Sequence, residues 1–112
     1  MREVNSLYFN SIKSKLLKKN FTVGIIGLGY VGLPLALTFC EKNIRVIGFD
    51  INNEYIKKLN NGKSYIKFFP DQIIKRIKKK KFFATSNFSL INNIDFIIMC
   101  LPTPLKKNKA PE

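Results

Sequence analysis

Apolar and polar residues form alternating blocks along this chain, and the apolar spacing switches between strand-like and helical. Four short apolar runs are typical of strands buried on both faces of a parallel sheet. These runs are residues 22–27, 44–49, 82–85 and 94–101. Helical spacing occurs between them, at residues 30–40, 52–59 and 70–80, with a brief helical turn at 88–91. This alternation predicts an α/β fold built on a parallel sheet of about four strands with right-handed crossovers.

A separate amphipathic pattern precedes the first strand. Residues 6–19 carry lysines between apolar residues at roughly helical spacing: Leu7, Phe9, Ile12, Leu16 and Leu17. We therefore expect a helical arm over residues 1–20 and one α/β domain over residues 21–112. The arm would either dock on a partner subunit or cover one edge of the domain.

The charge of the chain allows two interpretations. Its 112 residues are enough for one small domain, and 20 Lys and Arg against 7 Asp and Glu give a net charge of +13. Such a charge suits a polyanionic partner, whether nucleic acid, an anionic membrane or a phosphorylated ligand. A genome-wide bias toward lysine, asparagine and isoleucine would produce the same balance. The spread of basic residues along most of the chain favours this second interpretation.

The sharpest basic cluster is the run Lys75–Lys81. One interpretation is a patch for nucleic acid or another polyanion. The other is a solvated helix face above a buried row formed by Ile73, Ile74 and Ile77. No aromatic residue interleaves with these lysines to stack on bases, which favours the solvated face. We therefore expect no nucleic-acid partner.

The sequence offers little for metal, disulfide or membrane chemistry. Cys40 and Cys100 are too few and too far apart for a zinc site or a disulfide framework, and the chain has no histidine. We predict that Cys100 is a buried core thiol, that Cys40 packs and is inert, and that neither is catalytic. Without an apolar run of about 18 residues or a secretory signal, we expect no membrane span and a cytoplasmic location.

The strongest candidate site is a glycine-rich loop between the first predicted strand and helix. It reads Gly27-Leu28-Gly29-Tyr30-Val31-Gly32. Glycines in this pattern permit a tight turn, close approach of a pyrophosphate to the backbone, and close packing of the helix on the strand. Free N–H groups at the helix start, at the positive end of its dipole, bind phosphates. The context therefore predicts a Rossmann-like sheet that binds a dinucleotide.

An acidic residue completes this pattern. Asp50 ends the second predicted strand and follows Gly29 by 21 positions, close to the spacing of about 20 residues found in dinucleotide-binding folds. Its carboxylate would accept hydrogen bonds from the adenosine ribose hydroxyls. The same negative charge would repel a 2′-phosphate, and no arginine follows it. The sequence therefore favours NAD over NADP as the cofactor.

Several short motifs resemble the UDP-glucose/GDP-mannose dehydrogenase family of nucleotide-sugar 6-dehydrogenases. Residues 23–36 resemble the start of the family's sequences, and Tyr-Val-Gly-Leu-Pro at 30–34 is more specific than the glycines alone. Residues 62–66 and 101–105 are similar to the branch that acts on UDP-N-acetylhexosamines, such as the UDP-N-acetylglucosamine 6-dehydrogenases. The resemblance covers roughly residues 20–112, and the preceding helical arm also resembles that branch.

The resemblance implies an NAD-dependent oxidoreductase acting on a UDP-sugar. In the family, two NAD molecules take the C6 alcohol of the sugar to a carboxylate, and a cysteine carries a thioester between the steps. By position, the glycine loop and Asp50 would contact the cofactor. Thr85, at the end of the third strand, and Thr103, after the fourth, would line its nicotinamide side, and Pro102 would also contact the cofactor. The full-length enzyme would be a homo-oligomer that feeds polysaccharide synthesis.

The chain differs from the family's usual pattern at two places and is much shorter than family members. Tyr55 stands where the family often has a basic residue, and Lys67-Phe68-Phe69 stand in a loop that is usually acidic. Family members run to several hundred residues, so the resemblance implies an inactive amino-terminal fragment or a truncated reading frame. It would lack the catalytic cysteine region and the substrate domain. The alternatives are a stand-alone, non-catalytic dinucleotide-binding module and a basic nucleic-acid-binding domain.

Overall fold

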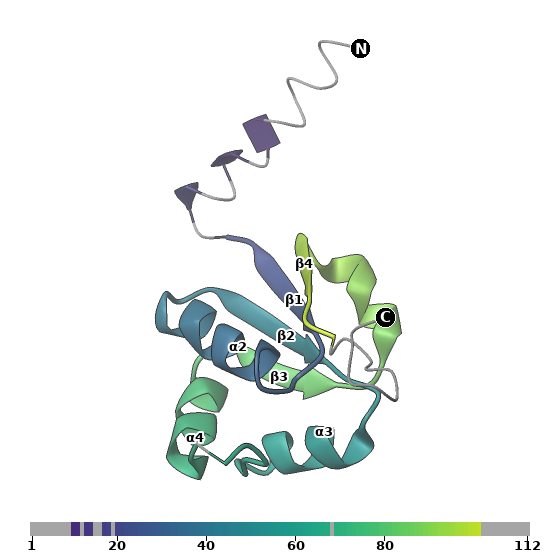
Figure 1. Ribbon diagram of the computed structural model, residues 1–112. Helices are drawn as coiled ribbons and strands as arrows, with labels where there is room; N and C mark the ends of the chain where they lie inside the picture. The colour runs from purple at the N-terminus through teal and green to yellow at the C-terminus, as the bar shows by residue number, and fades with distance from the viewer. Residues whose placement is uncertain (1–9, 12, 15–16, 19, 68, 102–112) are drawn as a thin grey trace, which may run out of the picture.

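A four-stranded, all-parallel sheet forms the centre of the computed structural model, which describes residues 10–11, 13–14, 17–18, 20–67 and 69–101 (Figure 1). The strand order is β3-β2-β1-β4. The strands are β1 (Thr22–Ile26), β2 (Arg45–Phe49), β3 (Phe82–Thr85) and β4 (Phe96–Met99). This arrangement confirms the predicted Rossmann-like α/β fold, because it is the order of the first four strands of a doubly wound dinucleotide-binding sheet, one complete half and the first strand of the other.

Helical elements connect the strands as expected. They are α2 (Gly32–Glu41), α3 (Asn53–Asn60), α4 (Asp71–Lys79) and the 3-10 helix η1 (Phe88–Asn93). Asn52 caps α3, since its side chain accepts the backbone N–H groups of Glu54 and Tyr55 at 3.0 and 3.2 Å. Gly62 follows the end of α3 with φ +74°, a conformation that glycine adopts without strain. In the predicted arm, residues 10–11, 13–14 and 17 are helical, and the others lie outside the described residues.

Two boundaries differ from the sequence pattern. The first helix begins at Gly32 rather than at Tyr30, because Val31 is its N-cap. The last strand begins at Phe96 rather than at residue 94. Ile94 instead completes the 3-10 helix by donating its N–H to the Ile91 carbonyl at 3.1 Å. The apolar run therefore spans the end of one element and the start of the next.

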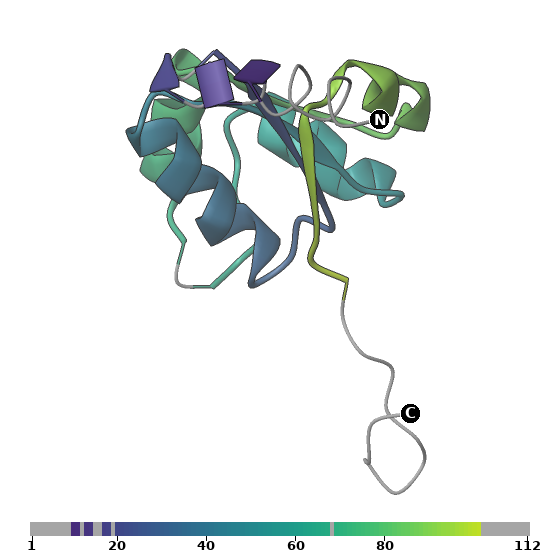
Figure 2. The same ribbon diagram turned by 90° about the horizontal axis from the view of Figure 1, so that it is seen from above.

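The core lies mainly on one face of the sheet. Val23, Ile25, Val46 and Ala84 are buried on the strands, and α2 and α4 contact these strands. Figure 2 shows α2 on one side of β1. The opposite face is only partly covered, with Phe88 of η1 packed on Phe49 at a ring distance of 5.5 Å.

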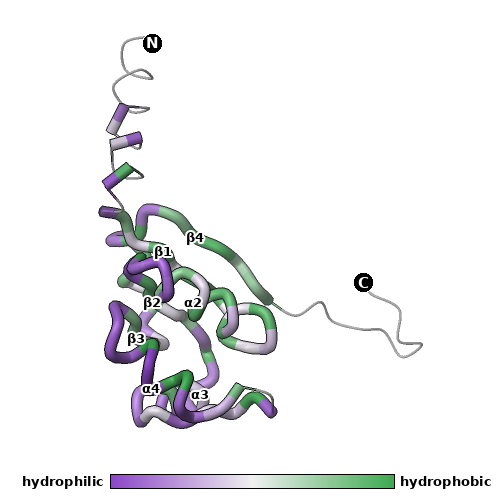
Figure 3. The backbone as a smooth tube through the Cα atoms, turned by 90° about the vertical axis from the view of Figure 1, so that its left-hand side faces the viewer, coloured by the Kyte–Doolittle hydropathy of each residue, from purple (hydrophilic) through white to green (hydrophobic). Residues whose placement is uncertain are grey.

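Beyond this contact, several side chains on the second face are exposed. Phe83 lies in a run expected to be buried on both faces but is 47% exposed, because alternate residues of a strand point to opposite faces. Met99 on β4 is 66% exposed although β4 is hydrophobic along its length (Figure 3). Since all four strands run in the same direction, their carboxyl ends meet at one edge, and the loops there can form a site.

Candidate functional site

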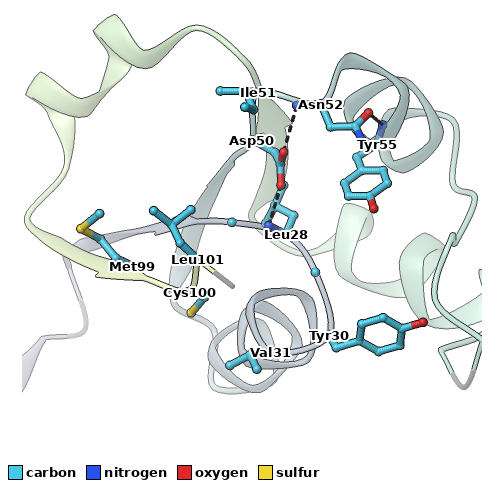
Figure 4. A pocket seen from close by; sticks show the side chains of 12 residues that line it. Leu28, Tyr30, Val31, Asp50, Ile51, Asn52, Tyr55, Met99, Cys100 and Leu101 are labelled. Carbon is cyan, nitrogen blue, oxygen red and sulfur yellow. Dashed lines mark hydrogen bonds between the residues drawn. The ribbon is translucent and has the colours of Figure 1, made fainter. Parts of the chain in front are cut away.

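A pocket of about 930 Å³ lies at the carboxyl ends of β1, β2 and β4. Its walls come from three loops (Figure 4). Residues 27–31 form one wall, Asp50, Ile51, Asn52 and Tyr55 form the second, and residues 99–101 form the third. In the strand order, β2 and β3 lie on one side of β1 and β4 lies on the other, so the order reverses between β1 and β4 and this is the topological switch point. Ligands of open α/β sheets bind in that crevice.

The three glycines of the loop have different surroundings. Gly27 has φ +99°, and a Cβ there would lie 2.6 Å from the Cys100 carbonyl oxygen. A Cβ on Gly32 would lie 1.8 Å from the Gly27 carbonyl oxygen. At Gly29, by contrast, a Cβ would meet nothing within 4 Å. Packing within the chain therefore requires glycine at 27 and 32, whereas Gly29 leaves open space next to its backbone.

Backbone donors surround this open space. Within the described part of the chain, the N–H groups of residues 29–32 donate to no protein acceptor. The helical ladder begins with Leu33, whose N–H donates to the Gly29 carbonyl at 3.1 Å. Unpaired N–H groups at the start of a ten-residue helix, with the positive end of its dipole, favour an anionic ligand. The loop therefore fits a pyrophosphate.

Both backbone groups of Leu28 are held by side chains from elsewhere in the sequence. Its N–H donates to Asp50 Oδ2 at 2.9 Å, and its carbonyl accepts the hydroxyl of Tyr65. Burial, with the nearby Asp50 carboxylate, raises the pKa of Tyr65, so its phenol stays protonated and donates. Sequence reasoning missed this role of Tyr65, because no local pattern links residues 37 positions apart. Together these contacts fix the loop before any ligand binds.

Asp50 therefore has a structural role as well as its expected one. Its Oδ1 accepts the Asn52 N–H at 2.9 Å while Oδ2 accepts that of Leu28 (Figure 4). Each carboxylate oxygen has a second lone pair, and the residue lines the pocket. A ribose diol could therefore still donate to it. No lysine or arginine is among the described residues that line the pocket, so a 2′-phosphate would meet a carboxylate without a compensating cation.

The rim of the pocket is apolar. Of eight large hydrophobic side chains that are exposed in the described structure, five line this pocket. They are Tyr30, Val31, Ile51, Met99 and Leu101. Exposed apolar residues gathered around a cleft with few polar groups are typical of small-molecule sites. The rim therefore suits the flat faces of a base.

The two cysteines have different environments, and the prediction for one of them is wrong. Cys100 is not a buried core thiol; it is only partly buried and lines the pocket, because it follows the last residue of β4 at the open edge of the sheet. Cys40 is fully buried on α2. Its burial, aided by Glu41, raises the pKa of the Cys40 thiol to about 11, which opposes formation of a reactive thiolate.

Of the three cofactor residues expected at the ends of the third and fourth strands, only Thr85 is among the described residues. Thr85 ends β3, where its carbonyl accepts the Asp50 N–H at 3.3 Å and its hydroxyl accepts that of Asn87 at 3.0 Å. It is not among the residues that line the pocket. Pro102 and Thr103 lie outside the described residues. The roles of these three residues stay predictions.

The basic cluster on α4 resembles a solvated helix face. Ile74 and Ile77 are buried beneath it. Arg76 pairs with Glu41 at 2.7 Å, and the Lys78 ammonium donates to the Asn60 carbonyl. Over the residues that the structure describes, we find no group of three or more side chains able to hold a metal, and no helix with the length and apolarity to cross a membrane.

Comparisons with known proteins find similar sequences in one enzyme family. Residues 21–112 match the family described as "UDP-glucose/GDP-mannose dehydrogenase family, NAD binding domain". Protein CapL of Staphylococcus aureus is 40% identical over 93 residues, which are 83% of this chain and 21% of CapL. UDP-N-acetyl-D-glucosamine 6-dehydrogenase of Salmonella typhi is 39% identical over 90 residues, 80% of this chain and 20% of that protein.

A solved structure gives the same result at the level of the fold. The ternary complex of GDP-mannose dehydrogenase from Pseudomonas aeruginosa superposes with a TM-score of 0.72 and 29% identity. The superposition covers 80% of this chain and 21% of that chain. The chain thus spans about a fifth of the length of these relatives.

Proposed function

Since this chain belongs to the UDP-glucose/GDP-mannose dehydrogenase family and matches its NAD-binding domain, we propose how the pocket holds the cofactor. The pyrophosphate of NAD binds the N–H groups of residues 29–32, and the adenosine ribose donates its hydroxyls to Asp50. Gly27 and Leu28 form the floor beneath it, and the side chains of Tyr30 and Val31 pack beside it.

One observation carries this proposal. The open space beside Gly29 is bordered by unpaired N–H groups, and the Asp50 carboxylate lies on the facing wall of the same pocket. An anion bound by the N–H groups and a diol bound by the carboxylate are the two polar parts of an adenosine diphosphate. The lack of a lysine or arginine among the described residues that line the pocket supports NAD over NADP.

For the whole protein, we propose oxidation of the C6 alcohol of a UDP-N-acetylhexosamine to a carboxylate. Bound NAD supplies a hydride acceptor. Two successive oxidations therefore consume two NAD molecules, and water provides the second carboxylate oxygen. The relatives named as UDP-N-acetyl-D-glucosamine and UDP-N-acetyl-D-mannosamine dehydrogenases support this substrate class. A cytoplasmic location and homo-oligomeric assembly are further parts of the proposal. The part of the chain described here would bind cofactor without performing the chemistry.

Substitution of Gly29 tests the cofactor pose. The added Cβ of Gly29→Ala meets no protein atom within 4 Å, so the variant should fold like the wild type. The methyl group would fill the space that the pyrophosphate needs. We expect NAD affinity to fall about tenfold or more in calorimetric titration. Lys58→Ala, on the exposed side of α3, is the control and should bind NAD normally.

Parallel titrations separate this function from the alternatives. The wild-type chain should bind NAD more tightly than NADP and should show no tight binding of a DNA oligomer. Failure to bind NAD, or equal binding by the Gly29→Ala variant, would overturn the proposed pose. Tight and salt-sensitive DNA binding without NAD binding would instead favour the basic nucleic-acid-binding domain.

A further inference from the structure

Two tyrosines form a stacked pair at one wall of the pocket. The rings of Tyr55 and Tyr65 are parallel to within 5°, with centroids 3.9 Å apart. Tyr55 lines the pocket, whereas Tyr65 does not. The Tyr55 ring therefore stands between Tyr65 and the pocket. Figure 4 shows it at the start of α3, beside Asn52 and next to Leu28 of the glycine loop.

The position of Tyr55 is fixed from several directions. Its backbone N–H donates to the Asn52 side chain at 3.2 Å, and the Asn52 backbone N–H in turn donates to Asp50 at 2.9 Å. Behind it, the Tyr65 ring is held by the hydrogen bond of its hydroxyl to the Leu28 carbonyl. A ring that is already ordered loses little conformational freedom when a ligand packs against it.

We propose that Tyr55 is a specificity residue whose ring forms the wall for the adenosine half of the dinucleotide. This inference rests on the proposed binding of NAD. Asp50 and Tyr55 both line the pocket, and Asn52 makes a hydrogen bond with each of them, so a ribose bonded to Asp50 places its adenosine on the side of the pocket where the Tyr55 ring lies. An aromatic face attracts the apolar surface of a nucleoside but offers no positive charge.

Tyr55 thereby changes what this end of the pocket recognises. A basic side chain at this position would attract phosphate, including a 2′-phosphate. Tyr55 replaces that attraction with packing against a neutral surface. With the carboxylate of Asp50 nearby, the wall selects an adenosine with a free ribose diol.

The test compares Tyr55 variants in calorimetric titrations with NAD and with AMP, which carries only the adenosine half. Tyr55→Ala and Tyr55→Leu remove the aromatic face, and Tyr55→Phe keeps it. We expect the first two to weaken both ligands by about tenfold and Tyr55→Phe to stay within about twofold. Phe83→Ala removes an exposed aromatic residue of β3 that does not line the pocket and should change neither affinity.

The outcomes separate this inference from the proposed function. Circular dichroism identifies folded variants, and Tyr55→Leu retains apolar bulk against Tyr65 if the alanine variant unfolds. Unchanged NAD and AMP affinities in a folded variant would overturn the role of Tyr55 and leave NAD binding intact. Equal losses in Tyr55→Phe and Tyr55→Ala would assign the contact to the hydroxyl and overturn the packing role. A wild-type chain that binds no NAD would overturn the proposed function itself.

Discussion

Replacement of Asp50 by asparagine should loosen the glycine loop as well as weaken cofactor binding. The Asp50 carboxylate accepts two backbone N–H groups at 2.9 Å, one from Leu28 and one from Asn52. An asparagine has one acceptor oxygen, so its NH2 group would face one of these N–H donors. The variant therefore loses one hydrogen bond and weakens the other by removing the charge.

The size of the effect follows from these two contacts. Hydrogen bonds to charged groups contribute about 1.5–3 kcal/mol each, and removing one partner leaves the other unsatisfied. Asp50 is partly exposed, so water can compensate part of the loss and the lower end applies. We expect the free energy of unfolding to fall by about 2 kcal/mol. For a domain of this size, that lowers the midpoint of thermal unfolding by about 10 °C.

Thermal unfolding followed by circular dichroism measures this change, and titration with NAD and NADP measures the effect on the site. NAD affinity should fall by about tenfold or more, and the preference for NAD over NADP should narrow because the repelling charge is gone. Glu54→Gln is the matched control, since it removes an exposed negative charge four residues away and should change stability by less than about 0.5 kcal/mol. If Asp50→Asn unfolds at the same temperature as the control, the carboxylate does not hold the loop and our reasoning fails.

Three further predictions address the loop and the cysteines. Gly32→Ala places a Cβ 1.8 Å from the Gly27 carbonyl oxygen. It should therefore lower the free energy of unfolding, measured by urea titration, by about 3 kcal/mol or more. A free energy of unfolding equal to that of Gly29→Ala would contradict this prediction. Burial raises the pKa of the Cys40 thiol from its ordinary value of 9.0 to about 11. Burial of the protonated Cys40 thiol therefore contributes fully to the free energy of unfolding below pH 9. This contribution, about 2–3 kcal/mol in all, is lost as the pH rises toward 11. Cys40→Ala should flatten the curve of stability against pH between pH 9 and 11. A curve unchanged by this substitution would contradict the raised pKa of Cys40. In the native chain at about pH 8, iodoacetamide should label Cys100 and leave Cys40 unmodified, and NAD should slow the labelling of Cys100. Mass spectrometry identifies the labelled cysteine. Labelling of Cys100 that saturating NAD does not slow would place the cofactor elsewhere.

Much of the fold, and the glycines and Asp50 of the site, can be predicted from the sequence because they depend on short-range spacing. Parallel strands buried on both faces have continuous apolar runs, and helices between them have a longer period. The same logic identifies Gly27, Gly29 and Gly32, since they occupy one turn between a strand and a helix. Asp50 is found at a fixed distance because it ends the strand that follows one helical crossover.

Other features depend on contacts that the sequence pattern does not encode. Phe83 belongs to an apolar run but points to the less covered face of the sheet. Cys100 also belongs to such a run, yet it lies past the end of β4 and lines the pocket. Whether an apolar residue is buried depends on which elements cover it, and composition alone does not determine this.

The sequence by itself determined a dinucleotide-binding βαβ unit, because each of its parts lies within about 20 residues of the next. Only the tertiary structure showed what holds that unit ready for its ligand. Tyr65 reaches the Leu28 carbonyl across 37 positions, and its ring supports Tyr55 at the pocket wall. Asp50, expected only to bind the adenosine ribose, also fixes the loop. The Asp50 contact arises because parallel strands bring their carboxyl ends to the same edge of the sheet, whereas Tyr65 comes from the segment between α3 and α4.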